Sequence, residues 1–392
     1  MAADPLRWVD DELAALDTAG LRRRRTVREG PQGAGPIHWN GRDLVNFGSN
    51  DYLGLAAAEV RDAVLLTIER AGWGSGASPL VTGRGAVHEA LEQALARFEG
   101  TQAALLFSSG YAANLSTITA LVGKGDAVYL DAKNHASIID GCRLSGARME
   151  VYPHGDMAFL QRRLARRDDF RRRLIVTDSL FSMDGDFAPL AELAELAERY
   201  DAMLMVDEAH ATGVFGRLGR GVCEESGVER GVHIRVGTLS KALGSMGGFV
   251  AGSAALIDWL VNRARSYIFS TAPPEALAAA ALKALDVVLG DPHRRTLLRQ
   301  RAAMLRAGLQ RQGWNTGRSN SQIVPVILGD PQRTMDFSRA LQDHGLFVPG
   351  IRPPAVPPGE CLLRISLSYL HSDEDVQRLL DALAQQADRP PG

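Results

Sequence analysis

Short apolar runs recur between about residues 100 and 255. Several of them are apolar at every position rather than at alternate positions. Strands with that pattern are buried on both faces, which is typical of parallel sheets covered by helices. The pattern predicts strands over residues 104–107, 127–130, 174–177, 203–206, 234–237 and 248–251.

Amphipathic stretches separate the predicted strands. Within residues 87–98, apolar side chains recur at helical spacing and share one face, namely Val87, Leu91, Leu95 and Phe98. Residues 189–200 repeat the pattern with leucines. This alternation of strands and helices predicts an α/β fold with a mostly parallel sheet.

The pattern changes near residue 291. It predicts a long arginine-rich helix over 291–312, helices over 334–344 and after Asp373, and strands over 322–328, 346–348 and 362–367. We therefore expect an N-terminal segment with a helix and a short β pair at residues 1–44. We expect a large domain at 45–290 and a smaller α+β domain at 291–392, linked by an alanine-rich helix over 274–289.

Composition and charge exclude several classes of protein. Hydrophobic residues make up 45% and charged residues 23% of the 392 residues, as in a globular protein. The net charge of −2 argues against general nucleic-acid binding, and no apolar run approaches the ~18 residues of a membrane helix. The three cysteines form no C-x-x-C pair, and the acidic N-terminus lacks the apolar segment of a signal peptide. We expect a cytoplasmic protein with no metal site and no membrane or nucleic-acid partner.

Several catalytic motifs fail on inspection. Residues 207–210 spell the D-E-A-H box of helicases, but the sequence lacks the phosphate loop that a helicase also needs. It also lacks the motifs H-E-x-x-H, G-x-G-x-x-G and G-x-S-x-G. These absences argue against a helicase, a zinc protease, a plain dinucleotide-binding fold and an α/β-hydrolase.

Three features follow predicted strands, at the edge where open α/β sheets bind ligands. Residues 107–114 (F-S-S-G-Y-A-A-N) open a helix, where small residues let a phosphate reach free amides; a tight turn explains them equally well. Asp207 follows a fully apolar strand, so it needs a cationic or hydrogen-bonding partner; a helix cap or a salt bridge would also explain it. Lys241 lies among small and apolar residues, where partial desolvation activates an amine, although a surface lysine is the plain alternative.

Together the three features meet the needs of pyridoxal phosphate, which are a phosphate cradle, an acid at the pyridine nitrogen and an amine for the aldehyde. An ionised Asp207 keeps the pyridine nitrogen protonated, because an opposite charge favours the charged form. The 34 positions from Asp207 to Lys241 allow one strand and a connection. The ordered set predicts an enzyme that binds pyridoxal 5′-phosphate in the large domain.

Eight short segments extend this pattern over nearly the whole chain. They are N-F-G-S-N-D-Y-L-G-L at 46–55, G-S-G-A-S at 74–78, G-R at 83–84, S-G-Y-A-A-N at 109–114, N-H-A-S at 134–137, F-S-M-D-G-D at 181–186, D-E-A-H-A-T-G at 207–213 and T-L-S-K at 238–241. With these segments the chain resembles the α-oxoamine synthase family of fold-type-I pyridoxal-phosphate enzymes. The resemblance implies a homodimer with shared active sites.

The resemblance assigns four catalytic residues. Lys241 would bind the cofactor and later move protons at the substrate α-carbon. Asp207 would pair with the pyridine nitrogen. His135 would stack on the ring face, and His210 would hydrogen-bond its phenolic oxygen.

The resemblance also assigns further contacts to the cofactor. Gly110 and Tyr111 would offer backbone amides to the phosphate. Ser182 and Thr238 would contact the cofactor, although a purely structural role is a real alternative for both. Ser270 or Thr271 would reach the phosphate of the partner subunit.

Substrate contacts follow from the same resemblance. Arg364 would hold the amino-acid carboxylate, for which a planar guanidinium suits a bidentate contact. Arg22 matches a substrate-binding arginine, although a purely structural role is an alternative for it as well, and His135 would also face the substrate. Two positions depart from the pattern: Ala355 stands where threonine is usual, and Pro79 stands where relatives often carry a basic residue or glycine. Both departures concern the substrate pocket.

Residues 350–357 (G-I-R-P-P-A-V-P) most resemble the biotin-pathway branch of the family. That branch condenses L-alanine with pimeloyl-CoA, or with a pimeloyl carrier protein, and releases carbon dioxide to give 8-amino-7-oxononanoate. The alternatives within the family are 2-amino-3-ketobutyrate CoA ligase, which uses glycine and acetyl-CoA, and serine palmitoyltransferase. A catalytically silent regulatory subunit is the alternative of another class, and the retained Lys241 speaks against it.

Overall fold

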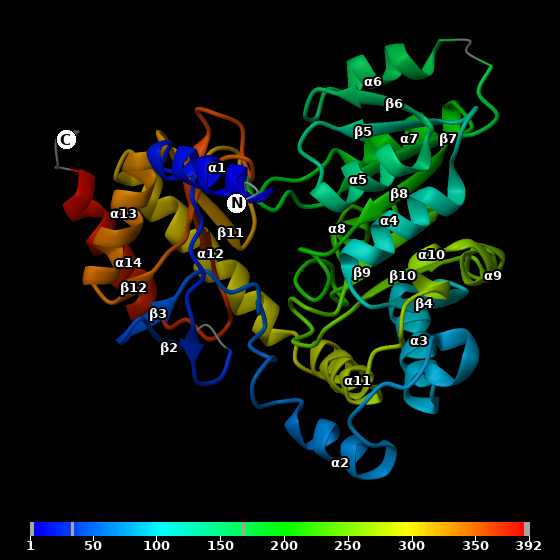
Figure 1. Cartoon of the computed structure of the whole chain (residues 1–392), viewed down its shortest axis with the longest axis horizontal. Helices are drawn as coiled ribbons and strands as arrows, with labels where there is room; N and C mark the ends of the chain where they lie inside the picture. The colour runs from blue at the N-terminus through cyan, green and yellow to red at the C-terminus, as the bar shows by residue number, and fades with distance from the viewer. Residues whose placement is uncertain (1–3, 33–34, 167–168, 388–392) are drawn as a thin grey trace. The chain divides into compact units, whose positions relative to one another are not determined.

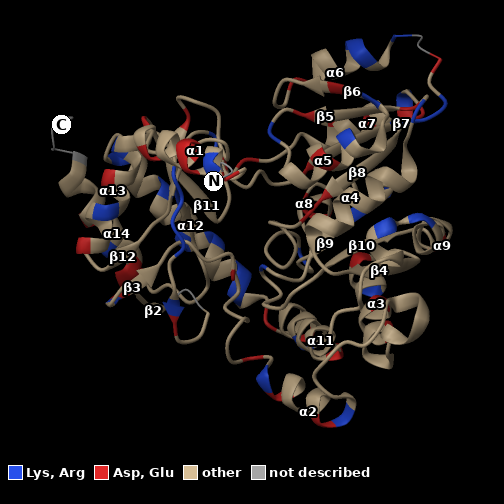
Figure 2. Ribbon diagram, viewed as in Figure 1, with Lys and Arg blue, Asp and Glu red and all other residues tan. Residues whose placement is uncertain are grey.

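The computed structural model describes residues 4–32, 35–166 and 169–387 (Figure 1). The chain forms two compact units. Unit 1 takes in the described residues of Met1–Ser49, Met183–Gly185 and Gln300–Gly392, and unit 2 those of Asn50–Ser182 and Asp186–Arg299. The domain boundaries expected after residues 44 and 290 stay a prediction. Acidic and basic residues are mixed over both units (Figure 2).

A seven-stranded sheet forms the centre of unit 2, with the strand order β4-β10-β9-β8-β7-β5-β6. The strands are β4 (Ala103–Phe107), β5 (Ala127–Asp131), β6 (Arg148–Tyr152), β7 (Arg173–Asp178), β8 (Met203–Asp207), β9 (Ile234–Thr238) and β10 (Gly248–Gly252). Neighbours from β9 to β6 are parallel, and β10 is antiparallel to both of its neighbours. The structure therefore confirms the mostly parallel sheet and all six predicted strands.

Strand β6 is the one member of this sheet that the hydrophobic pattern did not predict. It lies at the sheet edge, and its residues alternate between buried and more exposed positions. Its sequence, R-M-E-V-Y, includes an arginine and a glutamate. Arg148 and Val151 are exposed, and the buried Glu150 is paired with Arg148 and Arg163, so β6 has no continuous apolar run.

Helices cover the sheet of unit 2 (Figure 1). They are α2 (Arg61–Ala71), α3 (Ala86–Glu99), α4 (Gly110–Leu121), α5 (Ala136–Ser145), α6 (Met157–Leu164), α7 (Leu190–Arg199), α8 (Val222–Glu225), α9 (Ala254–Arg263), α10 (Arg265–Ile268) and α11 (Glu275–Gly290), with short turns η1 (Pro79–Gly83) and η2 (Glu229–Gly231). Their apolar faces complete a core that includes Leu105, Ile118, Val128, Leu174 and Leu260. Among the described residues, no helix is long and apolar enough to cross a bilayer.

Unit 1 joins the two ends of the described chain. A four-stranded sheet has the order β1 (Arg28–Glu29), β2 (Pro36–Trp39), β3 (Arg42–Asn46) and β12 (Leu346–Phe347), with β12 parallel to β3. A three-stranded sheet has the order β11 (Ile323–Gly329), β14 (Cys361–Ser366) and β13 (Gly350–Ile351). The helices of this unit are α1 (Arg7–Thr18), α13 (Pro331–Asp343) and α14 (Asp373–Ala387), together with α12 (His293–Arg311) from Gln300 onwards.

A buried histidine closes the core of unit 1. The rings of Phe47 and His371 stack with their centroids 4.1 Å apart. His371 Nδ1 accepts a hydrogen bond from the Ser368 amide at 2.9 Å, and Nε2 donates to the Asn46 carbonyl at 3.1 Å. One nitrogen accepts and the other donates, which is the pattern of a neutral imidazole. Burial lowers the pKa of His371 to about 4.

We expect His371 to make unit 1 sensitive to acid. The unfolded chain protonates a histidine at about pH 6.5, so the unfolded state binds more protons between that pH and the folded pKa of about 4. The free energy of unfolding therefore falls as the pH drops through this window, by at most about 3 kcal/mol. Urea unfolding at about pH 7.5 and about pH 5 measures this loss.

In the His371→Gln protein the side chain at position 371 has no group that titrates in this window, so this protein should lose less stability in acid than the parent. The His38→Gln protein is the control. The hydrogen bond to Asp43 raises the pKa of the exposed His38, so removing this histidine should leave the acid loss at least as large as in the parent. An equal acid loss in the His371→Gln protein and the parent would show that other groups carry the pH dependence.

Candidate active site

The parallel strands of unit 2 have their carboxyl ends along one border of the sheet, which is the edge meant below and is distinct from the outermost strand β6. Asp207 is the last residue of β8. Its carboxylate is 5% exposed. Oδ2 accepts a hydrogen bond of 2.6 Å from Asn114 Nδ2, and Oδ1 accepts one of 2.8 Å from the Ala209 amide. These neutral donors hold the carboxylate in one orientation at the strand end.

A chain of hydrogen bonds runs from Asp207 to His135. Asn114 Nδ2 also donates a hydrogen bond of 3.0 Å to Ser137 Oγ. Ser137 Oγ lies 2.7 Å from His135 Nδ1, and the Ser137 amide donates to the same nitrogen at 3.2 Å. Since Nδ1 accepts, the neutral His135 ring carries its proton on Nε2.

A second carboxylate holds the backbone of His135. Asp178 ends β7 in register with Asp207 on β8, and its Oδ2 accepts a hydrogen bond of 2.7 Å from the His135 amide. Burial, with the Asp207 charge in the same direction, raises the pKa of Asp178 well above its usual range. The surroundings of His135 lower its pKa through desolvation; the Lys241 ammonium adds to this effect and Asp207 opposes it.

Lys241 lies in the tight connection between β9 and β10. The Leu239 amide bonds the Gly247 carbonyl at 3.0 Å, and the Gly244 amide bonds the Lys241 carbonyl at 2.9 Å. Gly244 has φ +59°, and a Cβ there would lie 2.5 Å from the backbone of Leu55, so this position needs glycine. The turn holds the half-buried lysine close enough for its charge to act on both His135 and Asp178.

His210 follows the same strand as Asp207. It is buried, and its Nδ1 lies 2.7 Å from Tyr52 Oη. Tyr52 is itself fully buried, and its hydroxyl also lies 3.2 Å from Asn50 Oδ1. The ring of His210 is therefore fixed by the segment that opens unit 2.

The start of α4 offers amides to an anion. Ser109 caps the helix, with its Oγ accepting from the Ala112 amide at 3.1 Å. The first amides of a helix lack intrahelical partners and carry the positive end of the helix dipole, which leaves those of Gly110 and Tyr111 for a ligand. A Cβ at Gly248 would lie 2.5 Å from the Gly110 nitrogen, so a glycine on β10 lets the strand approach this amide.

These residues fit pyridoxal phosphate by their chemistry. The edge brings together a buried acid, a half-buried lysine, a histidine whose pKa is lowered, and a helix start with open amides. One further feature of this edge is that Asn114 Oδ1 is buried and has no hydrogen-bond partner among the described residues.

Comparison with known proteins agrees with this chemistry. Residues 42–383 match the family model for aminotransferase class I and II. Among curated relatives, 8-amino-7-oxononanoate synthase of Geobacter sulfurreducens is 49% identical over 383 residues, covering 97% of each chain. The enzyme of that name from Anaeromyxobacter dehalogenans is 51% identical over 385 residues, covering 98% of this chain and 96% of its own.

The chain belongs to the α-oxoamine synthase family of pyridoxal-phosphate enzymes. Solved structures agree with the fold-type-I architecture. A lysine-to-alanine variant of serine palmitoyltransferase from S. paucimobilis, solved with a bound PLP–myriocin aldimine, has a TM-score of 0.92 at 34% identity, covering 97% of this chain and 98% of its own. An 8-amino-7-oxononanoate synthase from Francisella tularensis has a TM-score of 0.76 at 28% identity, covering 88% and 97%.

The other predicted cofactor contacts of unit 2 lie in connections of the chain. Thr238 ends β9, and its buried hydroxyl donates to the Gly247 carbonyl at 2.9 Å. Ser182 is half-buried in the connection from β7 to α7. Thr271 is exposed between α10 and α11, next to Ala272, whose amide bonds the Ala77 carbonyl at 3.0 Å. Their contacts with a cofactor stay predictions.

Three of the predicted substrate residues belong to unit 1. Arg364 lies on β14, whereas Arg22 and Ala355 lie in connecting segments. Arg364 is buried on β14, with its Nη1 donating to Ser366 Oγ at 2.7 Å. Arg352 Nη2 donates to the Arg22 carbonyl at 2.9 Å. The structure therefore brings the segment that carries Arg22 beside the segment that carries Ala355.

Sequence reasoning missed the supporting residues of the site. Asn114 and Ser137 stood within quoted motifs, but no pattern indicated that they connect Asp207 to His135. Asp178 had a usable signal, because it follows the apolar run 174–177 as Asp207 follows 203–206. That signal marks a buried acid and gives it no chemical role until its neighbours are known.

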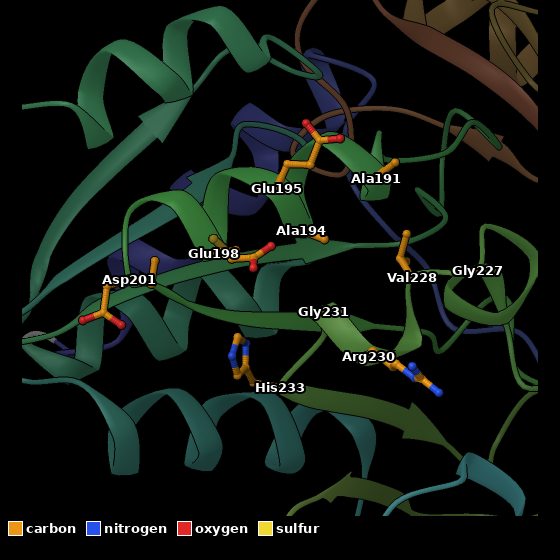
Figure 3. Close-up of a pocket in the computed structure, with 12 residues that line it drawn as sticks. Ala191, Ala194, Glu195, Glu198, Asp201, Gly227, Val228, Arg230, Gly231 and His233 are labelled. Carbon is orange, nitrogen blue, oxygen red and sulfur yellow. The ribbon is translucent and has the colours of Figure 1, made fainter.

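A surface pocket of about 680 Å³ lies elsewhere in unit 2 (Figure 3). It is lined by α7 and η2, and Ala202 and His233 place it at the amino ends of β8 and β9. None of the predicted site residues lines this pocket. The candidate active site is therefore at the opposite edge of the sheet from this pocket.

We expect the Asn114→Ala protein to be less stable than the parent. The change removes both donors of the amide, so the buried Asp207 loses a charge-assisted hydrogen bond, which costs about 1–3 kcal/mol. The midpoint of urea unfolding measures the effect. The Asn262→Ala protein is the control, because Asn262 makes one exposed bond within α9. Equal midpoints for the two variants would show that Asp207 does not depend on Asn114.

Proposed function

We propose that this chain condenses L-alanine with a pimeloyl thioester, releasing carbon dioxide and forming 8-amino-7-oxononanoate, a step in biotin synthesis. Relatives of that name are about half identical over nearly the full length of both chains, which is the observation that carries the substrate assignment. The geometry supports this chemistry, because the buried carboxylate of Asp207 at the end of β8 can face a cationic ring that stabilises a carbanion.

We assign pyridoxal 5′-phosphate to the edge where β8 and β9 end. When bound, this group draws electrons from the α-carbon of the amino acid through its protonated ring. Asp207 would keep the pyridine nitrogen charged, because an opposite charge favours the charged form. Lys241 Nζ would hold the aldehyde carbon, and the amides of Gly110 and Tyr111 would bind the phosphate.

The remaining contacts follow the same geometry. His210, fixed by Tyr52, would hydrogen-bond the phenolic oxygen. Ser182 and Thr238 would contact the cofactor from the same subunit, and Ser270 or Thr271 from the partner. These assignments rest on the family motifs.

Lys241 and His135 would handle protons during the condensation. Lys241 Nζ would take the proton from the α-carbon of the bound amino acid and later return one. His135 would donate from Nε2, since its Nδ1 accepts from Ser137, and its lowered pKa keeps the ring neutral near pH 7. A neutral donor at this place suits the thioester carbonyl, where negative charge develops.

Arginines would select the substrate carboxylates. Arg364 would bind the carboxylate of the amino acid, and Arg22 the distal carboxylate of the pimeloyl chain. The hydrogen bond between Arg352 and the Arg22 carbonyl supports a shared role for these segments. Ala355 would leave the substrate without the hydroxyl contact that a threonine supplies.

We also propose a homodimer with shared active sites. Helix α2 has no buried residue, and apolar side chains nearby are exposed, including Leu65, Leu66 and Trp73. Phe269, which precedes Ser270, is 69% exposed. Apolar patches of this kind are typical of protein interfaces.

Serine palmitoyltransferase is the second candidate, because structures of that name superpose with a TM-score of 0.92. Their identity of 34–36% is lower than the 49–51% of the oxononanoate synthases from Geobacter sulfurreducens and Anaeromyxobacter dehalogenans. Glycine and acetyl-CoA would be the substrates of a ketobutyrate ligase. A silent regulatory subunit would have no use for the arrangement of Lys241, Asp207 and His135.

We expect L-alanine to be preferred over glycine and serine, and pimeloyl-CoA over acetyl-CoA and palmitoyl-CoA. Competition assays with the purified protein, with products identified by mass, compare kcat/KM for each pair. The margin between the amino acids should be modest, since one methyl group discriminates by about 1–3 kcal/mol. A higher kcat/KM for glycine with acetyl-CoA, or for serine with palmitoyl-CoA, would contradict the assignment.

We expect borohydride reduction of the holoenzyme to fix the pyridoxyl group on Lys241. The chain has four lysines, the others being Lys124, Lys133 and Lys283, so peptide mapping separates every candidate. The Lys241→Ala protein, treated in the same way, should carry no stoichiometric label. A label on any of the other three lysines would refute the role of Lys241.

A further inference from the structure

A buried histidine bridges two buried carboxylates at the same edge of the sheet. His154 follows β6, and its Nδ1 lies 2.9 Å from Asp131 Oδ1 while its Nε2 lies 3.0 Å from Asp186 Oδ2. The side chain of His154 is 13% exposed, and those of the two aspartates are 2% and 8% exposed. None of these three residues has a role in the chemistry assigned above.

The geometry requires a charged ring. Each nitrogen of His154 faces a carboxylate oxygen, which accepts a hydrogen bond and cannot donate one when ionised. Burial alone would lower the pKa of His154, but its hydrogen bonds to Asp131 and Asp186 and their charges outweigh burial and raise it to about 9. The ring also packs edge-on against Phe181, with centroids 4.4 Å apart.

The two carboxylates belong to different parts of the chain. Asp131 ends β5, and it also accepts hydrogen bonds from the amides of Lys133 and Gly155, at 2.8 Å and 3.0 Å. Asp131 is therefore held rigidly at the end of its strand. Asp186 lies in the connection from β7 to α7, where an isolated antiparallel bridge joins Leu180 and Phe187.

The connection that holds Asp186 also carries Ser182. The Phe181 amide bonds the Asp186 carbonyl at 3.0 Å, so the residues between them form a closed loop. Ser182 is the last residue of unit 2 before this loop enters unit 1 at Met183–Gly185, and Asp186 is the first residue after it returns. His154 contacts both ends of the loop, through the ring of Phe181 and the carboxylate of Asp186.

We propose that His154 is a positioning residue, which as an imidazolium ties Asp186 to the end of β5 and thereby holds Ser182 at the cofactor end of the sheet. This inference rests on the proposed cofactor contact of Ser182. Backbone hydrogen bonds from Phe181 to Asp186 and from Ala188 to Ser179 close the base of this loop, and the triad adds a side-chain tie from the loop to β5. Without the charge on His154, Asp131 and Asp186 would repel each other across a site of low dielectric.

A double-mutant cycle tests the proposal through the dissociation constant of pyridoxal phosphate, measured by the absorbance of the bound cofactor. The Ser182→Ala and His154→Gln proteins should each bind the cofactor at least about threefold more weakly than the parent. The double variant should be no weaker than the worse single variant, because residues that act through one another are not additive. Losses that multiply would overturn the proposal.

Two further variants guard against simple misfolding. The Asp186→Asn protein keeps the size of the side chain and removes one charge, and it should weaken cofactor binding as His154→Gln does. The His38→Gln protein removes an exposed histidine that pairs with Asp43, and it should bind the cofactor as the parent does. Cofactor binding as tight as in the parent in both His154→Gln and Asp186→Asn would refute the positioning role.

Raised pH gives a second readout. The folded pKa of His154 is above its unfolded value, so its contribution is complete below about pH 6.5 and is lost as the pH rises through about 9. Asp131 and Asp186 are the charged groups that face the ring, and Asp178 and Tyr152 interact electrically with Asp131. The ratio of dissociation constants between His154→Gln and the parent should therefore fall towards one above about pH 9. A ratio that stays constant would contradict a role for the charge.

The outcomes separate this proposal from the proposed function. An unchanged dissociation constant in Ser182→Ala overturns the cofactor contact of Ser182, and the positioning role falls with it. Failure of the parent to convert L-alanine and pimeloyl-CoA overturns the substrate assignment alone, because the cycle measures cofactor binding without turnover.

Discussion

Three adjacent strands of the unit 2 sheet end in buried aspartates. Asp131 ends β5, Asp178 ends β7 and Asp207 ends β8, and each carboxylate is at most 5% exposed. A buried charge is costly unless it is paired or hydrogen-bonded. Because parallel strands bring these carboxylates to one edge, the surrounding loops and helix starts must supply donors there.

Each aspartate meets this requirement in a different way. Asp207 is held by Asn114 on α4 and by the Ala209 amide. Asp178 binds the amide of His135, and its raised pKa shows that burial and the neighbouring charge are not fully offset. Asp131 binds two amides and the ring of His154. The negative edge thus suits a lysine and a cationic ring, which is what carbanion chemistry on pyridoxal phosphate needs.

The regular elements of this fold were predictable because they depend on local patterns. The six predicted strands are mostly apolar, and α3 and α7 show a helical stripe. Edge strand β6 was not predictable in this way, because half of its residues are polar or face water. The parallel pairing of β3 with β12 joins positions about 300 residues apart, as in Val45 with Leu346, and no local pattern encodes such a contact. Local motifs assigned roles to Lys241 and Asp207. The supporting roles of Asn114, Ser137 and Tyr52 depend on contacts between distant positions, so no local motif indicated them.

Two histidines at this edge have pKa values shifted in opposite directions. Asp178 binds the backbone amide of His135 and makes no hydrogen bond to the ring; the Ser137 amide donates to Nδ1, and desolvation lowers the pKa of the ring. Asp131 holds His154 through its ring, and with Asp186 it raises the pKa of that ring to about 9. Near pH 7 the first ring is neutral and can exchange a proton, whereas the second is a fixed cation. Whether an aspartate binds the backbone or the ring therefore separates the proton-transfer role proposed for His135 from the positioning role proposed for His154.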